Sequence, residues 1–373
     1  MSWAVSMSPL LGLLLAAPLW AAAARPPFDI SDAPWRTDFS RHTVPLEEII
    51  SGGPPRDGIP PIDKPVFVTP AAANGWLRDR EPVVAVAHRG EAKAYPLQIL
   101  IWHEIVNDQI GGDPVAVTFC PLCNSAIAFD RRLEGMVLDF GTTGRLRHSD
   151  LIMWDRQTES WWQQLTGEAI VGTLAGKRLA MLPASIVSYA AFKETYPQGK
   201  VLSRDTGFHR DYGRNPYYGY DDIDSTPFLF RGPLDGRLPP MERVVAVSLG
   251  GVDKAYPYRL LAEQRVVYDT VGGQRLVVLY SPGTASALDR SEIAASRDVG
   301  ATGVFVPEID GRSLTLAAQG PHFVDRETGS TWNVMGKALA GPLAGRQLPP
   351  VLHGDHFAFA WLAFKPQTQI YAP

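Results

Sequence analysis

The stretch AVAHRGEAKAYPLQILIWHEIVNDQIGGDPVAVTFCP, residues 85–121, decides the fold because the chain repeats it. Residues 246–282 read AVSLGGVDKAYPYRLLAEQRVVYDTVGGQRLVVLYSP, at a constant offset of 161 residues and with no gap. The motif Lys93–Pro96 recurs as Lys254–Pro257, and both stretches carry a Gly-Gly pair at the same place. A repeat at fixed spacing indicates that one structural unit occurs twice.

Further matches follow in the same order along both halves. WDRQTESWW at 154–162 matches VDRETGSTW at 324–332, and GEAIVGTLAGKRL at 167–179 matches GKALAGPLAGRQL at 336–348. We therefore predict two tandem copies of one domain of about 120 residues, a usual domain size. The fold class that we predict is α+β and β-rich, with the two copies forming two lobes.

The local pattern predicts the same elements in each copy. PVVAVAHRG and RVVAVSLGG predict strands that end in a turn, and the β-branched runs DPVAVTF and QRLVVLY predict buried strands after a Gly-Gly turn. PLQILIWHEIVND predicts a short helix that opens at a proline and is followed by a strand. LPASIVSYAAFKETYP has helical spacing and ends at Tyr-Pro, so we expect a helix there.

These patterns divide the chain into five parts. We predict a signal peptide at 1–24, an N-terminal extension at 25–84, the first lobe at 85–202, a connecting loop at 203–243 and the second lobe at 244–373. The connecting loop is rich in Gly, Pro, Asp and Tyr. It is too long and too aromatic for a flexible linker, so we expect a structured loop that lies against one lobe.

The N-terminal segment predicts export. An apolar run from Pro9 to Trp20 is short for a membrane span and ends in four alanines, Ala21–Ala24. Small residues at that place form a signal-peptide cleavage site, so we expect cleavage near Ala24. No later segment is long and apolar enough to span a membrane. We therefore predict a periplasmic or secreted protein, in a compartment where thiols tend to be oxidised.

Composition excludes some function classes. The formal net charge of −4 comes without a basic stripe, which argues against nucleic acid as a partner. Glycine (34) and proline (32) are spread along the chain, as in a turn-rich globular protein. The common hydrolase motifs G-x-S-x-G and H-E-x-x-H are missing. We expect a small molecule or a metal ion as the ligand.

Comparing the two copies separates residues that serve the fold from candidates for chemistry. Cys120 and Cys123 are the only cysteines, and they are spaced C-x-x-C. Together with His103 they are absent from the second copy, whose residues at these places are Ser281, Thr284 and Gln264. Because three residues able to bind a soft metal are lost together, we place one site in the first lobe.

A metal centre is the first interpretation of this site. Two cysteines two residues apart can place both sulfurs on one ion, with a histidine as third ligand. If the Gly111–Gly112 turn closes a hairpin, His103 and Cys120 lie near each other on adjacent strands. Met153 is a candidate for a fourth, weaker ligand. These ligands suit Cu(I) or Zn²⁺, and a methionine ligand would favour Cu(I).

Two other interpretations remain open at this stage. Cys-Pro-Leu-Cys followed by Asn124–Ser125 resembles the start of a helix that would lower the pKa of an exposed thiol, as in a thiol-disulfide oxidoreductase. The pair could also form a structural disulfide in a non-catalytic envelope protein. Whether the protein is an enzyme is left open.

Two other polar motifs are predicted to be structural. The Asp-Arg pair at 155–156 recurs in the second copy, which favours an ion pair at a turn. The two histidines of HGDH, residues 353–356, are expected to be exposed on an amphipathic C-terminal helix.

Several long motifs together resemble one known family. HEIVND at 103–108, VTFCPLCNSAIAFDR at 117–131, DFGTTGRLR at 139–147 and RDYGRNPY at 210–217 are similar to the exported-protein family catalogued as domain of unknown function 3179. The resemblance extends from about Asp63 over most of the chain and implies a secreted or envelope protein. It points to the Cys-Pro-Leu-Cys region without supplying an activity. At His148 the family pattern has asparagine, so Met153 is preferred over His148 as a ligand.

Overall fold

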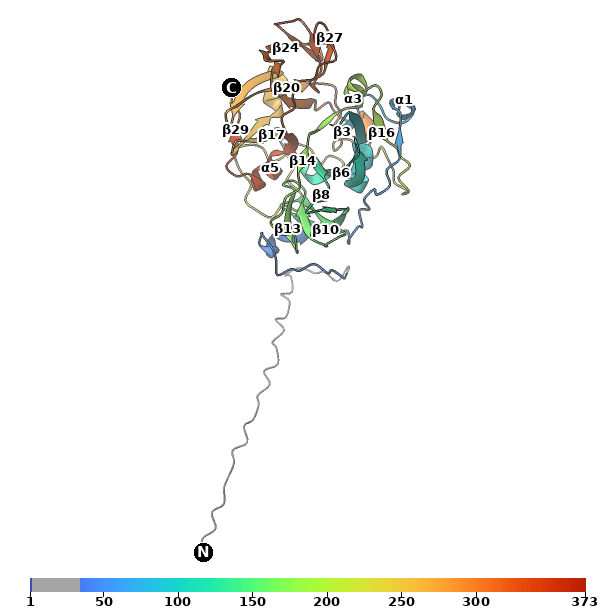
Figure 1. Ribbon diagram of the computed structural model, residues 1–373, viewed down its shortest axis with the longest axis vertical. Coiled ribbons are helices and arrows are strands. Elements are labelled where there is room, and N and C mark those ends of the chain that lie inside the picture. Colours follow the sequence, from blue (N-terminus) through green and yellow to red (C-terminus); the bar gives the residue numbers. More distant parts are fainter. Residues whose placement is uncertain (2–33) are drawn as a thin grey trace.

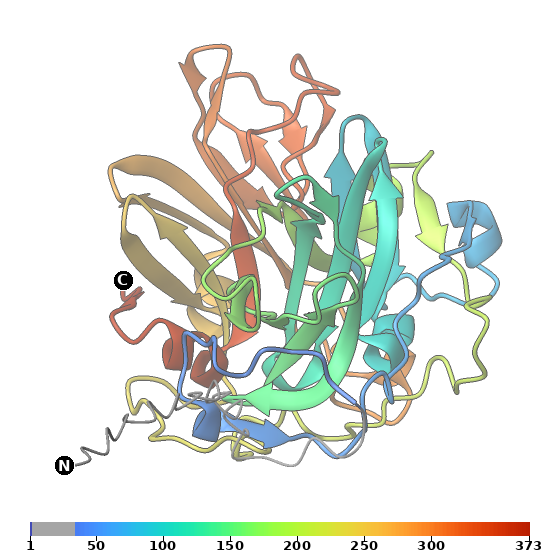
Figure 2. The ribbon, with the colours of Figure 1, turned by 60° about the horizontal axis from the view of Figure 1, so that its bottom comes forward.

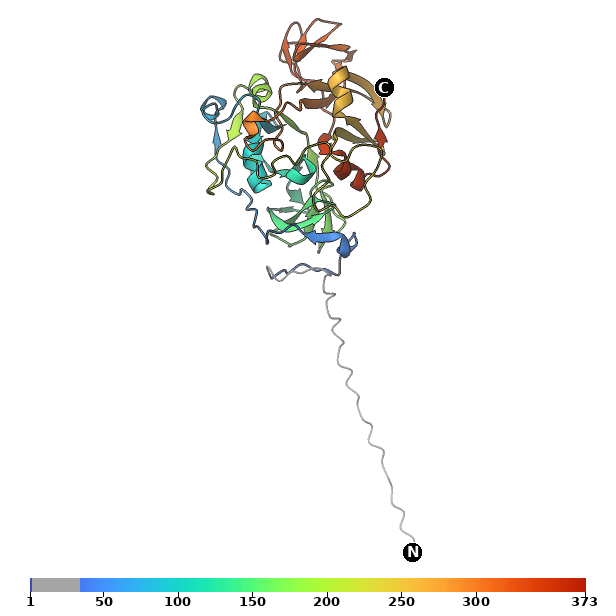
Figure 3. The ribbon, with the colours of Figure 1, turned by 180° about the vertical axis from the view of Figure 1, so that it is seen from behind.

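The computed structural model describes residue 1 and residues 34–373, so the predicted signal peptide lies outside the described residues. Strands make up 41% and helices 12% of the structure, which confirms the predicted β-rich fold. The strands form several sheets, and the first half (blue to green) lies beside the second half (yellow to red) in Figures 1 and 2. Seen from behind, the short helices α2 (Leu97–His103), α4 (Tyr258–Gln264) and α5 (Ala358–Phe364) lie on the facing side (Figure 3).

The first half contains three sheets of four or five strands, with strand orders β15-β3-β4-β16-β2, β14-β7-β6-β5 and β1-β10-β11-β12-β13, and the two-stranded sheet β8-β9. Besides α2, its elements are η1 (Leu46–Glu48), β1 (Ile49–Ser51), β2 (Phe67–Val68), α1 (Pro70–Ala73), β3 (Pro82–His88), β4 (Glu91–Pro96), β5 (Ile105–Ile110), β6 (Asp113–Cys120), η2 (Pro121–Cys123), β7 (Ser125–Asp130), β8 (Arg132–Leu133), β9 (Met136–Val137), β10 (Phe140–Arg147), β11 (Asp150–Asp155), β12 (Trp161–Gln163), β13 (Glu168–Val171), β14 (Met181–Leu182), β15 (Ala184–Ser188), α3 (Tyr189–Thr195) and β16 (Lys200–Leu202).

The second half contains sheets of order β28-β17-β18-β29, β19-β20-β21 and β24-β25-β26-β27. Besides α4 and α5, its elements are β17 (Arg243–Leu249), β18 (Val252–Pro257), β19 (Val266–Val271), β20 (Gln274–Ser281), η3 (Ile293–Ala295), β21 (Ala301–Phe305), β22 (Glu308–Ile309), β23 (Arg312–Ser313), β24 (Leu316–Gln319), β25 (His322–Asp325), β26 (Thr331–Trp332), β27 (Ala338–Ala340), β28 (His353–Phe357) and β29 (Gln369–Ile370).

The bounds of five successive elements agree between the halves. β3, β4, α2, β5 and β6 begin and end 161 residues before β17, β18, α4, β19 and β20. The flanking strands pair alike, since β15 and β28 run antiparallel to β3 and β17, whereas β16 and β29 run parallel to β4 and β18. Superposition of the two lobes stays a prediction.

The turn at Gly111–Gly112 fixes the register between β5 and β6 in the first half. Gly111 and Gly112 have φ of 58° and 84°, the left-handed region that a two-residue hairpin turn requires. A Cβ on Gly111 would lie 2.7 Å from the carbonyl oxygen of His88, so a side chain does not fit there. β5 and β6 then pair from Ile110↔Asp113 outward, and their β-branched residues are buried on both faces.

A Lys-Tyr-Asp network recurs in both halves, buried in the first half and partly buried in the second. Lys93 Nζ lies 2.9 Å from Asp108 Oδ2, to which Tyr95 OH donates at 2.6 Å. In the second half Lys254, Tyr256 and Asp269 repeat these contacts at 2.6 and 2.8 Å. The shared K-A-Y-P motif therefore ties strand β4 or β18 to the following hairpin.

The D-R-x-T motif also recurs in detail, but not as the predicted ion pair. Asp155 accepts hydrogen bonds from the backbone and hydroxyl of Thr158 and from Trp162 Nε1, at 2.6, 2.9 and 2.9 Å. Asp325 accepts the equivalent three at 2.6, 2.9 and 2.8 Å. Arg156 instead pairs with Asp63 at 2.8 Å, because the buried Asp155 already has its hydrogen bonds filled.

Two local predictions differ from the structure. The helix predicted from LPASIVSYAAFKETYP begins only at Tyr189, capped by the Ser188 side chain, because residues 184–188 pair with β3. HGDH lies on strand β28 rather than on a helix, since residues 353–357 pair with β17. His356 is consequently buried, not exposed as predicted.

Candidate metal centre

The two cysteines lie at the tip of the β6–β7 hairpin. Cys120 ends β6, Pro121–Cys123 form a single 3-10 turn, and Asn124 has a φ of 48° that turns the chain into β7. Cys120 pairs with Ser125 across the hairpin. Ser125 thus begins a strand and caps no helix. The helix N-terminus expected for a thiol-disulfide oxidoreductase is therefore not formed after the cysteine pair.

Asp150 is the third donor that meets the two thiols. One ligand atom each of Cys120, Cys123 and Asp150 lies within 4.8 Å of the others, and all three residues are buried. Asp150 begins β11 after a tight turn in which His148 and Ser149 both have left-handed φ values, 53° and 65°. This turn brings the end of β10–β11 to the cysteine hairpin, where Cys120 Sγ lies 3.7 Å from the Ser149 carbonyl oxygen.

The carboxyl of Asp150 is only half provided with hydrogen bonds. Its Oδ2 accepts from Gln163 Nε2 at 2.6 Å and from the Leu165 backbone at 2.9 Å. Its Oδ1 is buried and has no hydrogen-bond partner within the described residues. The Asp150 carboxyl also interacts with the thiols of Cys120 and Cys123, whose hydrogen bonds act against the rise of its pKa. A thiol is a weak donor, so a cation would satisfy this buried oxygen better.

Burial raises the pKa of every acidic group of this site, which favours its protonated form. It raises the pKa of Cys120 and, further, that of Cys123, and it raises the pKa of Asp150 to about 6. Burial and the neighbouring Asp150 raise the pKa of Glu104 to about 8. A cation among these groups would stabilise their charged forms, which metal ligation requires.

The connecting loop covers the hairpin tip. Tyr220 OH donates to the Leu122 carbonyl oxygen at 3.0 Å, and Ser149 Oγ donates to the Phe228 carbonyl oxygen at 2.7 Å. Burial raises the pKa of Tyr217, and Glu104 and Cys120 add to this rise, which places this phenol beside the site as well. Glu104 itself adopts a left-handed φ of 57° at the end of α2.

His103 lies outside the group formed by Cys120, Cys123 and Asp150. Its Nδ1 is 2.7 Å from the Pro60 carbonyl oxygen and its Nε2 is 2.7 Å from Tyr212 OH. The predicted hairpin exists, but His103 still belongs to α2, and the left-handed Glu104 redirects the chain before β5 begins. Burial lowers the pKa of His103 to about 4, so the ring is neutral.

Met153 is completely buried on β11, beside Thr142 and Trp162. It belongs to the same apolar cluster as Cys120 and Cys123. The structure thus surrounds the thiols with apolar side chains on the β11 side.

Sequence reasoning did not find Asp150. The signal was present, because the offset of 170 residues that relates WDRQTESWW to VDRETGSTW aligns Asp150 with Gly320. The same comparison that singled out the cysteines would therefore have included this carboxylate.

Comparison with known proteins agrees with the resemblance noted above. The model of the family described as "Protein of unknown function (DUF3179)" matches residues 56–368. The chain belongs to the DUF3179 family. No curated protein and no solved structure matches this DUF3179 chain. In the part of the chain that the structure describes, no helix is long and apolar enough to cross a membrane.

Proposed function

We propose that this DUF3179 protein binds one metal ion through the thiolates of Cys120 and Cys123 and the carboxylate of Asp150. The observation that carries the proposal is the unpartnered Oδ1 of a completely buried Asp150 beside two buried thiols. In a tetrahedral site with metal–sulfur bonds of about 2.3 Å the two sulfurs stand about 3.8 Å apart. The observed separations, all within 4.8 Å, need little closing to reach it.

The donor set favours Zn²⁺ over Cu(I). Zinc accepts thiolate and carboxylate ligands together, whereas Cu(I) prefers soft sulfur donors and gains little from a carboxylate. Cu(I) would need Met153 in place of Asp150. Three protein ligands leave a fourth position for water or a small molecule, next to Glu104.

A thiol-disulfide exchange function is the weaker proposal. A reactive cysteine is an exposed thiolate with a lowered pKa, whereas Cys120 and Cys123 are buried and burial raises both pKa values. A buried disulfide remains the competitor of the metal in an oxidising compartment.

We also infer that the protein is exported and that its halves arose as tandem copies of one domain. The apolar run before Ala21–Ala24 supports export. The shared element bounds, the repeated Lys-Tyr-Asp network and the repeated Asp155 and Asp325 hydrogen bonds support duplication.

Competition with a chromophoric chelator under reducing conditions tests the metal proposal. The untagged protein should take up one equivalent of Zn²⁺, and Cys120→Ser and Asp150→Asn should each weaken binding at least about tenfold, as loss of a ligand or of its support does. Ser281→Ala, at the matching place in the second half, is the control and should bind like the wild type. Equal affinity of Cys120→Ser and Ser281→Ala would overturn the proposal.

A further inference from the structure

A cavity of about 310 Å³ lies between the two halves, and its lining includes Ala126 and Leu165 near the cysteine hairpin but none of Cys120, Cys123 and Asp150. β7, β14 and the loop between β13 and β14 line it from the first half, and β17, β28 and α5 line it from the second. Pockets that bind small molecules measure about 300–1,000 Å³ and often lie between domains. The size and the place of the cavity therefore suit a small molecule.

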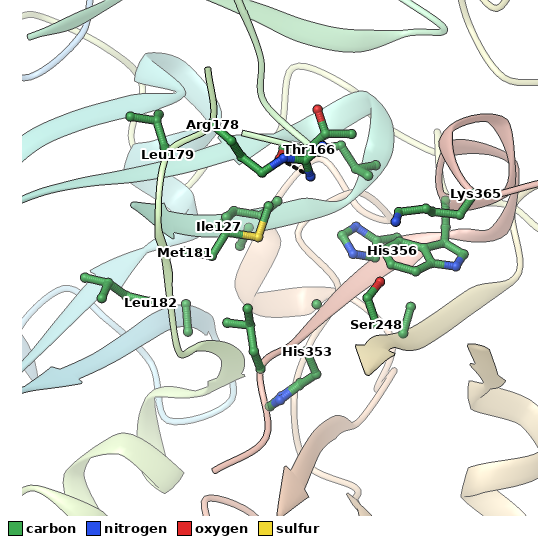
Figure 4. Close-up of a pocket in the computed structure, with 17 residues that line it drawn as sticks. Ile127, Thr166, Arg178, Leu179, Met181, Leu182, Ser248, His353, His356 and Lys365 are labelled. Carbon is green, nitrogen blue, oxygen red and sulfur yellow. Dashed lines mark hydrogen bonds between the residues drawn. The ribbon is translucent and has the colours of Figure 1, made fainter. Parts of the chain in front are cut away.

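The walls of the cavity are mainly apolar. Figure 4 shows Ile127 and Met181 on one side and His356 with Lys365 on the other. His356 stacks on Trp361 with ring centroids 5.1 Å apart and an interplanar angle of 18°, which makes a flat wall. Such a surface accepts the apolar body of a ligand, since burial of apolar area drives its binding.

The imidazole ring of His356 forms no hydrogen bond with any other described residue. The residue is 2% exposed and lines the cavity, and its Nδ1 is fully buried. Buried polar side chains nearly always have a partner. Burial lowers the pKa of His356 to about 3, so the ring is neutral and has one N–H to donate.

The charged residues that line the cavity are all basic. Arg178 and Lys365 are the charged side chains among the lining residues, which include no aspartate or glutamate. Lys365 Nζ lies 3.2 Å from Asp253 Oδ1, and Arg178 Nη2 lies 3.0 Å from Glu168 Oε2. Neither of these two acids lines the cavity. An ammonium group has three donors, so Lys365 can hold Asp253 and a ligand oxygen together.

We propose that this interlobe cavity binds a small molecule with an apolar body and one carboxylate. The apolar body packs between Met181 and the His356–Trp361 stack, and the carboxylate accepts from Lys365. The cavity would serve this ligand whether or not the cysteine site holds a metal, so the two proposals stand independently.

Calorimetric titration with two matched pairs of probes tests the proposal. Octanoate and 4-phenylbutyrate carry the carboxylate, and 1-octanol and 4-phenylbutan-1-ol lack it. The acids should bind about tenfold more tightly than their alcohols, the difference that one charge-assisted hydrogen bond supplies. Lys365→Met should remove this difference without weakening the alcohols, whereas Lys64→Met, an exposed lysine outside the cavity, should keep it.

A second variant separates binding in the cavity from binding elsewhere. Ser248 is exposed at the edge of the cavity, so Ser248→Trp should block entry with little cost to folding. All four probes should lose most of their binding. Acids that bind no better than alcohols, an absence of binding, or full binding by Ser248→Trp would each overturn the proposal.

Discussion

The segment from α2 to the end of β6 has the same element bounds in the first half as α4 to β20 in the second, but the side chains at its turns differ. The first half has Cys120, Glu104 and Asp150, and the second half has Ser281, Arg265 and Gly320 at the corresponding positions. In the second half these residues bond to the protein itself: Ser281 Oγ donates to the Pro321 carbonyl oxygen at 2.7 Å. Arg265 Nη2 donates to the Gly320 carbonyl oxygen at 3.0 Å.

The comparison separates the polar groups that the fold requires from those found only at the cysteine site. At the corresponding positions of the second half, Ser281 and Arg265 have hydrogen-bond partners and there is no carboxyl side chain. In the first half two thiols and two carboxyls are buried together, and Asp150 Oδ1 has no partner in the described residues. Because the matching positions of the second half lack these groups, they are the candidates for a functional role in the first half.

The largest expected effect comes from giving the first half the residues of the second. Zn²⁺ at a hundred times its dissociation constant should stabilise the wild type by about 2.7 kcal/mol. Cys120→Ser/Cys123→Thr should gain none of this, yet stay folded, because the second half tolerates Ser281 and Thr284 there. Thermal unfolding with and without Zn²⁺ measures both, and Thr284→Ser is the control. A double variant that Zn²⁺ still stabilises would show that the ligands are elsewhere.

The next largest effect is a loss of stability on replacing Asp155 or Asp325, which should be equal in the two halves. Asp155→Ala and Asp325→Ala each leave a Trp Nε1 and two Thr donors unpaired in the core, and each should cost about 2–3 kcal/mol of unfolding free energy. Arg156→Ala removes a half-exposed pair with Asp63 and should cost less than about 1 kcal/mol. Urea denaturation measures all three. A cost at one aspartate only would contradict a shared scaffold.

A smaller effect should depend on pH and occur only in the first half. In the metal-free protein Glu104 has a folded pKa of about 8 against an ordinary value of 4.5. The folded state keeps a proton that the unfolded state releases in this window, so Glu104 lowers stability as pH rises from 4.5 to 8. Glu104→Gln should therefore match the wild type at pH 4 and exceed it at pH 8, by on the order of 1–3 kcal/mol.

The counterpart in the second half gives the control for this pH effect. Arg265→Gln should leave the slope of stability against pH unchanged over the same window. Denaturant unfolding of each variant at several pH values, with a chelator present, provides the measurement. A Glu104→Gln variant that follows the wild-type slope would mean that Glu104 ionises normally.

The smallest effect should come from His103. His103→Gln copies Gln264, and both ring nitrogens of His103 are engaged by Pro60 and Tyr212. Zn²⁺ affinity should change by less than about threefold, against about tenfold or more for loss of a group that supports the metal. A larger loss in the chelator competition would restore His103 as a ligand.

Much of the framework could be predicted from the sequence because it depends on local rules. The Gly-Gly turns, the β-branched runs and the helix after Pro96 are specified by residues next to one another. The cysteine pair was likewise visible as a motif confined to one half. These features need no knowledge of how distant segments meet.

The rest depends on contacts between segments far apart in the sequence. Asp150 becomes a candidate ligand only when the β10–β11 turn meets the β6–β7 hairpin, and nothing in RHSDL predicts that meeting. HGDH forms a strand because β17 offers an edge with which it pairs. The helix α5 begins only after this strand, at Ala358. His103 ends α2 and lies two residues before β5 begins at Ile105, so it is not on the strand beside β6.

The connecting loop has a consequence for the rate at which the proposed metal ion would exchange. Two hydrogen bonds hold the connecting loop over the hairpin tip. Tyr220 OH donates to the Leu122 carbonyl oxygen, and Ser149 Oγ donates to the Phe228 carbonyl oxygen. For the proposed ion, we expect the residence time to depend on opening of this loop as well as on ligand strength. We also expect an apoprotein whose loop has already docked to take up metal more slowly than a chain that is still folding.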